Sequence, residues 1–176
     1  MRNENVKMIV EAGVMIALAY VLSLVKIWQA PMGGSVTAGS MIPIVLFALR
    51  WGYKKGVLIG VIYGIIQFML GPKWSYHPVS ILFDYLIAFG VLGFAGIFNG
   101  EIKKTVFGVF VAIFLRYICH VISGVVVFAS YAPETMSPLV YSLIYNSQYL
   151  IPEFIITGLI LSVLYKPLKS NKLLKI

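Results

Sequence analysis

Charged residues, acidic ones above all, and cysteine are scarce in this sequence. Only 11% of its 176 residues are charged, six of them acidic, while 60% are hydrophobic. Soluble domains average about 25% charged and about 45–50% apolar residues, so a water-soluble enzyme and a disordered chain are excluded. The single cysteine, Cys119, cannot form an intramolecular disulfide or build a zinc site. The sequence also lacks a Walker A motif, so we do not expect the chain to hydrolyse ATP. The composition indicates a membrane protein.

Six apolar stretches dominate the sequence. A transmembrane helix needs about 20 mostly apolar residues, and the candidates are 8–28, 39–51, 57–70, 79–98, 105–130 and 139–165. The second and third are short, so they must lean on neighbours, tilt or thin the bilayer. Segments rich in Gly, Pro and Ser follow at 29–35, 71–78 and 131–138. We predict an all-α membrane protein, a compact bundle of six transmembrane helices in a single domain over residues 1–176.

Lysine and arginine fall unevenly on the two sides of these spans. Eleven collect on one side: Arg2, Lys7, Arg50, Lys54, Lys55, Lys103, Lys104, Lys166, Lys169, Lys172 and Lys175. The other side has Lys26 and Lys73, and Arg116 lies within a span. Because basic residues concentrate in cytoplasmic loops, both termini are predicted to be cytoplasmic. Topology thus accounts for the net charge of +8, and we expect the lipid bilayer, not nucleic acid, as the partner of these charges.

Polar side chains within the spans point to a pocket. An ionisable residue in the bilayer costs roughly 2.5–3.5 kcal/mol on insertion scales, so each needs a partner or a purpose. At about 1.5 Å per residue, Asp84, Asn146 and His120 lie about 8, 12 and 15 Å from the outer loops. Tyr141 lies shallower on the last span. Together these four residues predict a pocket that opens to the outside.

Arg116 and Glu153 lie deeper, at about 21 and 22 Å. Their equal depth and opposite charge predict a structural ion pair between spans 105–130 and 139–165. A proton or ion relay is the functional alternative.

The predicted pocket suits a flat, positively charged ligand. No lysine or arginine lies at the depth of Asp84, so this carboxylate favours a cationic or amine-bearing ligand over a purely packing role. Tyr141, Tyr145 and Tyr149 repeat at i, i+4 and i+8 and predict an aromatic wall for stacking and cation–π contact. For His120, the alternative to a ligand-binding role is a structural one, in which the side chain is hydrogen-bonded to a backbone carbonyl inside the bundle. No second histidine lies at ligand spacing, so we expect no metal and no cofactor.

Four motifs resemble the thiamin-specific S-components of energy-coupling factor (ECF) vitamin transporters. They are GSVTAGSMIP at 34–43, DYLIAFGVLGFAG at 84–96, RYICHVISG at 116–124 and YSLIYN at 141–146. Each motif is weak alone, but the four occur in order along a chain of matching length and span number. The resemblance implies a high-affinity thiamin-binding membrane subunit without enzymatic activity. It implies a multi-pass protein of the prokaryotic plasma membrane.

The resemblance also assigns roles to individual residues. It implies a binding site for thiamin made from Asp84, Tyr85, His120, Phe128, Tyr141, Asn146 and Trp28. Trp28 corresponds to a tryptophan of the loop after the first span, which acts as a lid in the family. Phe128 stands where some relatives have tryptophan, and Asp84 stands where some have glutamate.

The resemblance also implies partner subunits. Members of the family dock on a scaffold transmembrane subunit through small residues of the first helix, and two ATPase subunits supply the energy for transport. The family pattern is Ala-x-x-x-Ala, and its nearest match here is Gly13 and Ala17, with Ala12 adjacent. Small residues of this kind let helices approach closely. Packing within the bundle is the alternative for this stripe.

Three other functions stay open at this stage. A related S-component for hydroxymethylpyrimidine would need much of the same pocket. An intramembrane enzyme would need paired carboxylates, a Ser/His pair or a metal site at catalytic spacing, and the spans show none of these. A purely structural membrane subunit would leave Asp84, His120 and Asn146 without a reason to be buried together.

Overall fold

The computed structural model describes residues 2–98, 100–171 and 174. Its long helices are α1 (Arg2–Leu24), α3 (Tyr53–Leu70), α6 (Ile102–Val127) and α7 (Pro138–Ser170), and α2 (Ile42–Trp51) is short. The 78–97 segment is helical throughout and combines α4 (Pro78–Ser80), the π-helix η1 (Ile81–Leu86), α5 (Ile87–Gly90) and the 3-10 helix η2 (Val91–Ile97). The strands β1 (Lys26–Gln29) and β2 (Ser35–Thr37) and the 3-10 turn η3 (Ala129–Tyr131) complete the structure.

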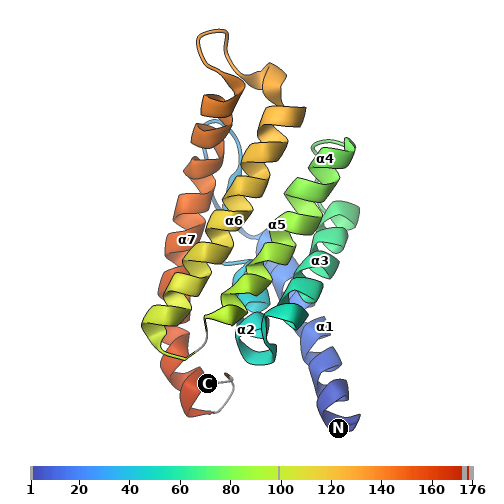
Figure 1. Ribbon diagram of the computed structural model, residues 1–176, viewed down its shortest axis with the longest axis vertical. Helices are drawn as coiled ribbons and strands as arrows, with labels where there is room; N and C mark the ends of the chain where they lie inside the picture. Colours follow the sequence, from blue (N-terminus) through green and yellow to red (C-terminus); the bar gives the residue numbers. More distant parts are fainter. Residues whose placement is uncertain (1, 99, 172–173, 175–176) are drawn as a thin grey trace.

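The helices form an elongated bundle (Figure 1). Helices α6 and α7 run side by side, and the 78–97 segment packs between α6 and α3. Helix α1 packs mainly on α2. The start of α1 and the end of α7 lie at the same end of the bundle, opposite the loop between α6 and α7 (Figure 1). The first helix therefore begins, and the last helix ends, on one side of the bundle, in agreement with the distribution of basic residues.

The outer surface of the bundle is apolar, as lipid contact requires. Five helical segments are long and apolar enough to cross a membrane: Asn3–Leu24, Tyr53–Leu70, Pro78–Ile97, Ile102–Val127 and Pro138–Ser170. Helix α1 in particular exposes Ile9, Val10, Val14 and Val21. The prediction of an all-helical membrane bundle is confirmed.

The second predicted span, 39–51, requires a correction, because helix α2 has only ten residues. Eight of them are buried, so α2 is the centre of the bundle and not a lipid-facing helix. Between α1 and α2 the chain forms an antiparallel hairpin of β1 and β2, in which Trp28 pairs with Val36. Backbone without helical bonds is tolerated at membrane depth only where protein or a cavity covers it. Strand β2 meets that condition, since Val36 is buried, whereas all four residues of β1 are exposed.

Glycines let the 78–97 segment pack directly on α3. A Cβ at Gly60 would overlap the carbonyl oxygen of Phe89, and a Cβ at Gly64 would lie 2.5 Å from the carbonyl oxygen of Tyr85. The backbones touch here, which larger residues would prevent. Tyr85 belongs to the π-helix η1, which also contains Asp84, so this backbone contact includes the π-helical turn. Such π-helical turns occur often at functional sites.

Candidate ligand-binding site

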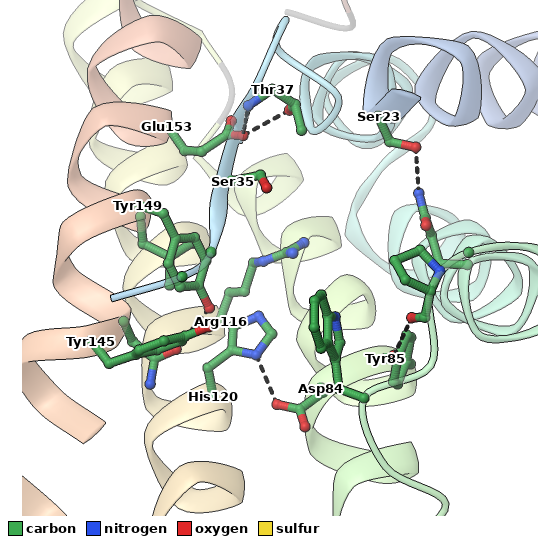
Figure 2. A pocket seen from close by; sticks show the side chains of 18 of the residues that line it. Ser23, Ser35, Thr37, Asp84, Tyr85, Arg116, His120, Tyr145, Tyr149 and Glu153 are labelled. Atoms are coloured by element: carbon green, nitrogen blue, oxygen red, sulfur yellow. Dashed lines mark hydrogen bonds and ion pairs between the residues drawn. The ribbon is translucent and has the colours of Figure 1, made fainter. Parts of the chain in front are cut away.

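A cavity of about 750 Å³ lies inside the bundle. The hairpin, α3, the 78–97 segment, α6 and α7 all contribute to its lining (Figure 2). Six of the predicted ligand-binding residues line it: Asp84, Tyr85, His120, Phe128, Tyr141 and Asn146. The four residues placed by depth, Asp84, Asn146, His120 and Tyr141, therefore share one cavity, and Tyr85 and Phe128, which the resemblance implies, line it as well.

The tyrosine wall of α7 is confirmed. Tyr141 and Tyr145 have ring centroids 6.1 Å apart, and Tyr145 and Tyr149 are also 6.1 Å apart in an edge-to-face contact. All three rings line the cavity. Tyr149 additionally meets the His120 ring at 6.1 Å, which joins the wall on α7 to α6. The cavity thus has an aromatic side against which a flat ring can pack.

Asp84 has more partners than the sequence predicts. Its Oδ1 lies 2.9 Å from His120 Nδ1, and its Oδ2 accepts hydrogen bonds from Ser80 Oγ at 2.7 Å and Ser123 Oγ at 2.5 Å. None of these partners is a lysine or arginine, but the carboxylate is already bonded to three protein groups, which the sequence analysis did not predict. Helical spacing carries the signal that was missed, because Ser80 lies one turn before Asp84 and Ser123 lies three residues after His120.

Asn146 and Tyr85 are also held by protein groups. The Asn146 amide donates to Ser142 O at 2.9 Å, and its Oδ1 accepts from Tyr149 OH at 2.7 Å. Tyr85 OH donates to Pro72 O at 3.0 Å, which ties the 78–97 segment to the loop before it. These bonds fix both side chains at the cavity wall, where their orientation is set before any ligand enters.

The predicted ion pair between Arg116 and Glu153 is not formed. Both side chains line the cavity, but Glu153 Oε1 accepts from Thr37 N at 2.6 Å and from Thr37 Oγ1 at 2.7 Å (Figure 2). The Arg116 guanidinium instead lies over the Phe89 ring, 4.0 Å from its centroid. The depths estimated from the sequence correctly place both charged side chains at the cavity, but they do not predict that Thr37 of the hairpin binds Glu153.

The hairpin closes one side of the cavity against α7. A Cβ at Gly34, where φ is +79°, would lie 2.5 Å from Tyr149 Cδ1, so only glycine fits this turn. Met32 Sδ accepts from Gln148 Nε2 at 3.1 Å. The Glu153–Thr37 bonds complete this contact. The loop after the first span thus lies against the cavity, as a lid would.

Trp28 is the one predicted site residue that the structure does not bring to the cavity. It lies on β1, is 46% exposed and is not among the lining residues. Trp74, in the loop between α3 and α4, lines the cavity instead. A tryptophan at a span end is usually an interfacial residue, so its position in the sequence alone does not reveal that Trp74 lines the cavity.

A cluster of polar side chains that was not predicted from the sequence joins α1 and α3 at the cavity wall. Gln67 Nε2 donates to Ser23 Oγ at 2.8 Å and to Tyr63 OH at 2.6 Å. Tyr63 OH donates in turn to Ala19 O at 3.1 Å. Ser23, Tyr63 and Gln67 all line the cavity.

The small residues of α1 divide between two faces. Ala12 is buried in the core, which contradicts its expected place on a docking face. Gly13 and Ala17 are exposed, and a Cβ added at Gly13 would meet no atom within 4 Å. An open Gly13-x-x-x-Ala17 face is what close approach by another helix requires.

The chain was also compared with known proteins. A family model described as "Thiamine transporter protein (Thia_YuaJ)" matches residues 9–173. The chain is 38% identical over 183 residues to "Thiamine transporter ThiT" of Bacillus subtilis (strain 168), covering 93% of this chain and 95% of that protein. It is 26% identical over 179 residues to "Thiamine transporter ThiT" of Lacticaseibacillus paracasei, covering 93% and 89%.

A solved structure titled "Native-SAD phasing for ThiT from Listeria monocytogenes serovar." resembles the fold with a TM-score of 0.81. It shares 23% identity and covers 97% of this chain and 98% of that one. At this identity the likeness bears on the fold, which it supports over nearly the whole chain.

Proposed function

The chain belongs to the thiamine transporter protein family, a family of membrane transporters and not of enzymes, and from this we propose that it binds thiamine in the cavity of the bundle. The observation that carries the proposal is the convergence of six predicted site residues on one cavity. In this proposal the chain is the S-component of an ECF-type transporter. It captures thiamine from outside, and separate subunits supply the energy.

The chemistry of the lining supports a flat cation with hydrogen-bonding edges. Thiamine carries a charged thiazolium ring and an aminopyrimidine ring. The Tyr141–Tyr145–Tyr149 wall and Phe128 offer faces for stacking and cation–π attraction. Asp84 supplies negative charge. We propose that Tyr85, Tyr141 and Asn146 contact the polar edges of the ligand, because each has a hydroxyl or amide at the cavity wall.

We propose that the exposed face of α1 docks on the scaffold subunit of the transporter. Gly13 and Ala17 lie on this face and allow a partner helix to approach closely. A chain without a nucleotide motif binds its ligand but cannot concentrate it, so uptake requires the scaffold and two ATPase subunits. With the basic residues collected at the end of the bundle that holds both termini, we further propose that this end is cytoplasmic, in a bacterial plasma membrane.

Titration of the purified full chain with thiamine tests the binding proposal. Trp74 lines the cavity, so its fluorescence should change until one thiamine is bound per chain. Trp74→Phe should lose most of this signal while calorimetry still detects binding, and Trp28→Phe is the matched control outside the cavity. Absence of calorimetric heat with the wild-type chain would refute the proposal.

Competition distinguishes thiamine from its pyrimidine fragment. Hydroxymethylpyrimidine lacks the thiazolium ring and cannot use the cation–π contacts, so it should displace thiamine only at much higher concentration. Equal or tighter binding of the fragment would make it the physiological ligand and refute thiamine as the substrate.

A further inference from the structure

Helix α1 is the least embedded of the five candidate membrane spans, although its C-terminal end reaches the cavity. Only 11% of its apolar stretch is buried, against 22–44% in the other four spans. Tyr20, Ser23 and Leu24, at its C-terminal end, line the cavity. Strand β1 begins at Lys26, directly after this helix end. The position of the end of α1 therefore sets where the hairpin begins.

One closed hydrogen-bond network joins this helix end to α3. Gln67 Nε2 donates to Ser23 Oγ at 2.8 Å and to Tyr63 OH at 2.6 Å, so both protons of the amide are used (Figure 2). Tyr63 OH donates to Ala19 O at 3.1 Å, and Ser23 Oγ donates to Tyr20 O at 2.6 Å. Every donor of these three side chains thus has an acceptor, and two of the acceptors are backbone carbonyls of α1.

Of the two helices, α3 is the fixed one. Gly60 and Gly64 bring its backbone against that of the 78–97 segment, and the Tyr63 ring packs edge-on against Phe89 with centroids 4.7 Å apart. The end of α1 is joined to it through side chains. Tyr63 and Ala19 are both 0% exposed. A hydrogen bond shielded from water is costly to break, so this network determines whether the end of α1 stays against α3.

We propose that the Tyr63–Gln67–Ser23 network fastens α1 over the cavity, and that this α1–α3 seam opens each time a ligand enters or leaves. Opening of the seam moves the base of the hairpin away from the cavity, while Glu153 holds the other end of the hairpin separately. Tyr63 is then a positioning residue, which acts through α1 and not through a contact with the ligand. The inference rests on the proposed function for the identity of the ligand.

Stopped-flow fluorescence of the full chain in detergent tests the seam with Tyr63→Phe, which keeps the ring and removes the hydroxyl. Association and dissociation of thiamine should both become about fivefold faster, and the Kd should stay within about twofold, because the barrier falls equally in both directions. Tyr117→Phe is the matched control. Its hydroxyl also donates to a backbone carbonyl, Leu143 O at 3.0 Å, but Tyr117 is not among the cavity-lining residues. Unchanged rates in Tyr63→Phe would overturn the proposal, and so would faster dissociation alone, which marks a direct ligand contact.

A covalent link across the seam makes the opposite change. Ser23→Cys with Gln67→Cys, in a Cys119→Ala background, places two thiols at side chains that are in contact. Linking them with a short bis-methanethiosulfonate reagent should bring both rates below those of the wild type, and a reductant should reverse the effect. Each single cysteine variant, treated with the same reagent, is the control. Undiminished exchange of thiamine in the linked chain would overturn the proposal, even if Tyr63→Phe fails to fold.

Hydrogen exchange of the ligand-free chain separates this inference from the proposed function. The α1 amides from Ala19 to Leu24 should exchange faster in Tyr63→Phe than in the wild type, and Tyr117→Phe should leave them unchanged. Equal exchange in Tyr63→Phe and the wild type would overturn the seam. If the wild type binds no thiamine by calorimetry, the proposed function fails, while this measurement still decides whether the network fastens α1.

Discussion

We expect the dissociation rate of the ligand to depend on the two hydrogen bonds between Thr37 and Glu153. Thr37 lies at the end of β2, and Glu153 is on α7, so these bonds join the hairpin to the helix across the cavity wall. Both reach the same carboxylate oxygen, at 2.6 and 2.7 Å. Ligand release past the hairpin requires this contact to break. Weakening it should therefore accelerate dissociation.

The magnitude follows from the charge on the acceptor. Hydrogen bonds to a charged group contribute about 1.5–3 kcal/mol, against about 0.5–1.5 kcal/mol for neutral partners. Glu153→Gln keeps the shape and removes the charge, so two bonds weaken by about 1 kcal/mol each. A total of about 2 kcal/mol corresponds to dissociation about thirtyfold faster. Thr37→Val loses only the hydroxyl donor to Glu153 and its bonds with Ser40, so its dissociation should be about tenfold faster.

Stopped-flow tryptophan fluorescence, with thiamine displaced by an excess of competitor, measures these rates. Thr37→Ser keeps both donors and should match the wild type, and Glu134→Gln makes the same chemical change on an exposed loop residue. Thr37→Val retains the Glu153 charge, so it separates closure of the hairpin from attraction of a cationic ligand. Wild-type dissociation rates in both Glu153→Gln and Thr37→Val would refute the reasoning.

Three further predictions test the site, the packing and the docking face. Asp84→Asn should weaken thiamine binding more than Asp84→Glu, measured by calorimetry, and equal losses would argue against a role for the charge. Gly60→Ala should lower the thermal unfolding temperature in detergent, because its Cβ overlaps the Phe89 carbonyl, whereas Gly158→Ala has open space and should not. Gly13→Leu with Ala17→Leu should leave affinity intact and reduce cellular uptake at normal expression; retained uptake would exclude this face from docking.

The sequence was sufficient to predict the helices and the depth of the side chains within them. A fixed rise per residue places Asp84, His120 and Asn146 in the same outer part of the bundle, about 8–15 Å from the loops, and the three line one cavity. The tyrosine wall follows from helical spacing in the same way. These are local rules, and they hold wherever the chain is a regular helix.

The errors arise where the chain is not helical. The length of the 39–51 stretch indicates a short span, and the structure has the short helix α2 there. Nothing in the composition of the preceding segment shows that it forms a hairpin of β1 and β2. The position of that hairpin decides that Thr37, and not Arg116, binds Glu153. It also decides that Trp28 faces away from the cavity. These contacts depend on tertiary position, which periodicity does not encode.

The hairpin connects the folding problem of a membrane protein to ligand capture. Glu153 lies about 22 Å along α7 from Pro138, so Thr37 meets it deep in the bundle, at the inner part of the cavity wall. The Thr37 N–H needs an acceptor at this depth, and the Glu153 carboxylate is that acceptor. The same bond closes the cavity. Opening the hairpin therefore leaves a backbone N–H and a carboxylate without their partners, so the bundle itself favours the closed arrangement. A bound ligand adds its own contacts to a wall that is already held in place, which favours slow release over fast exchange.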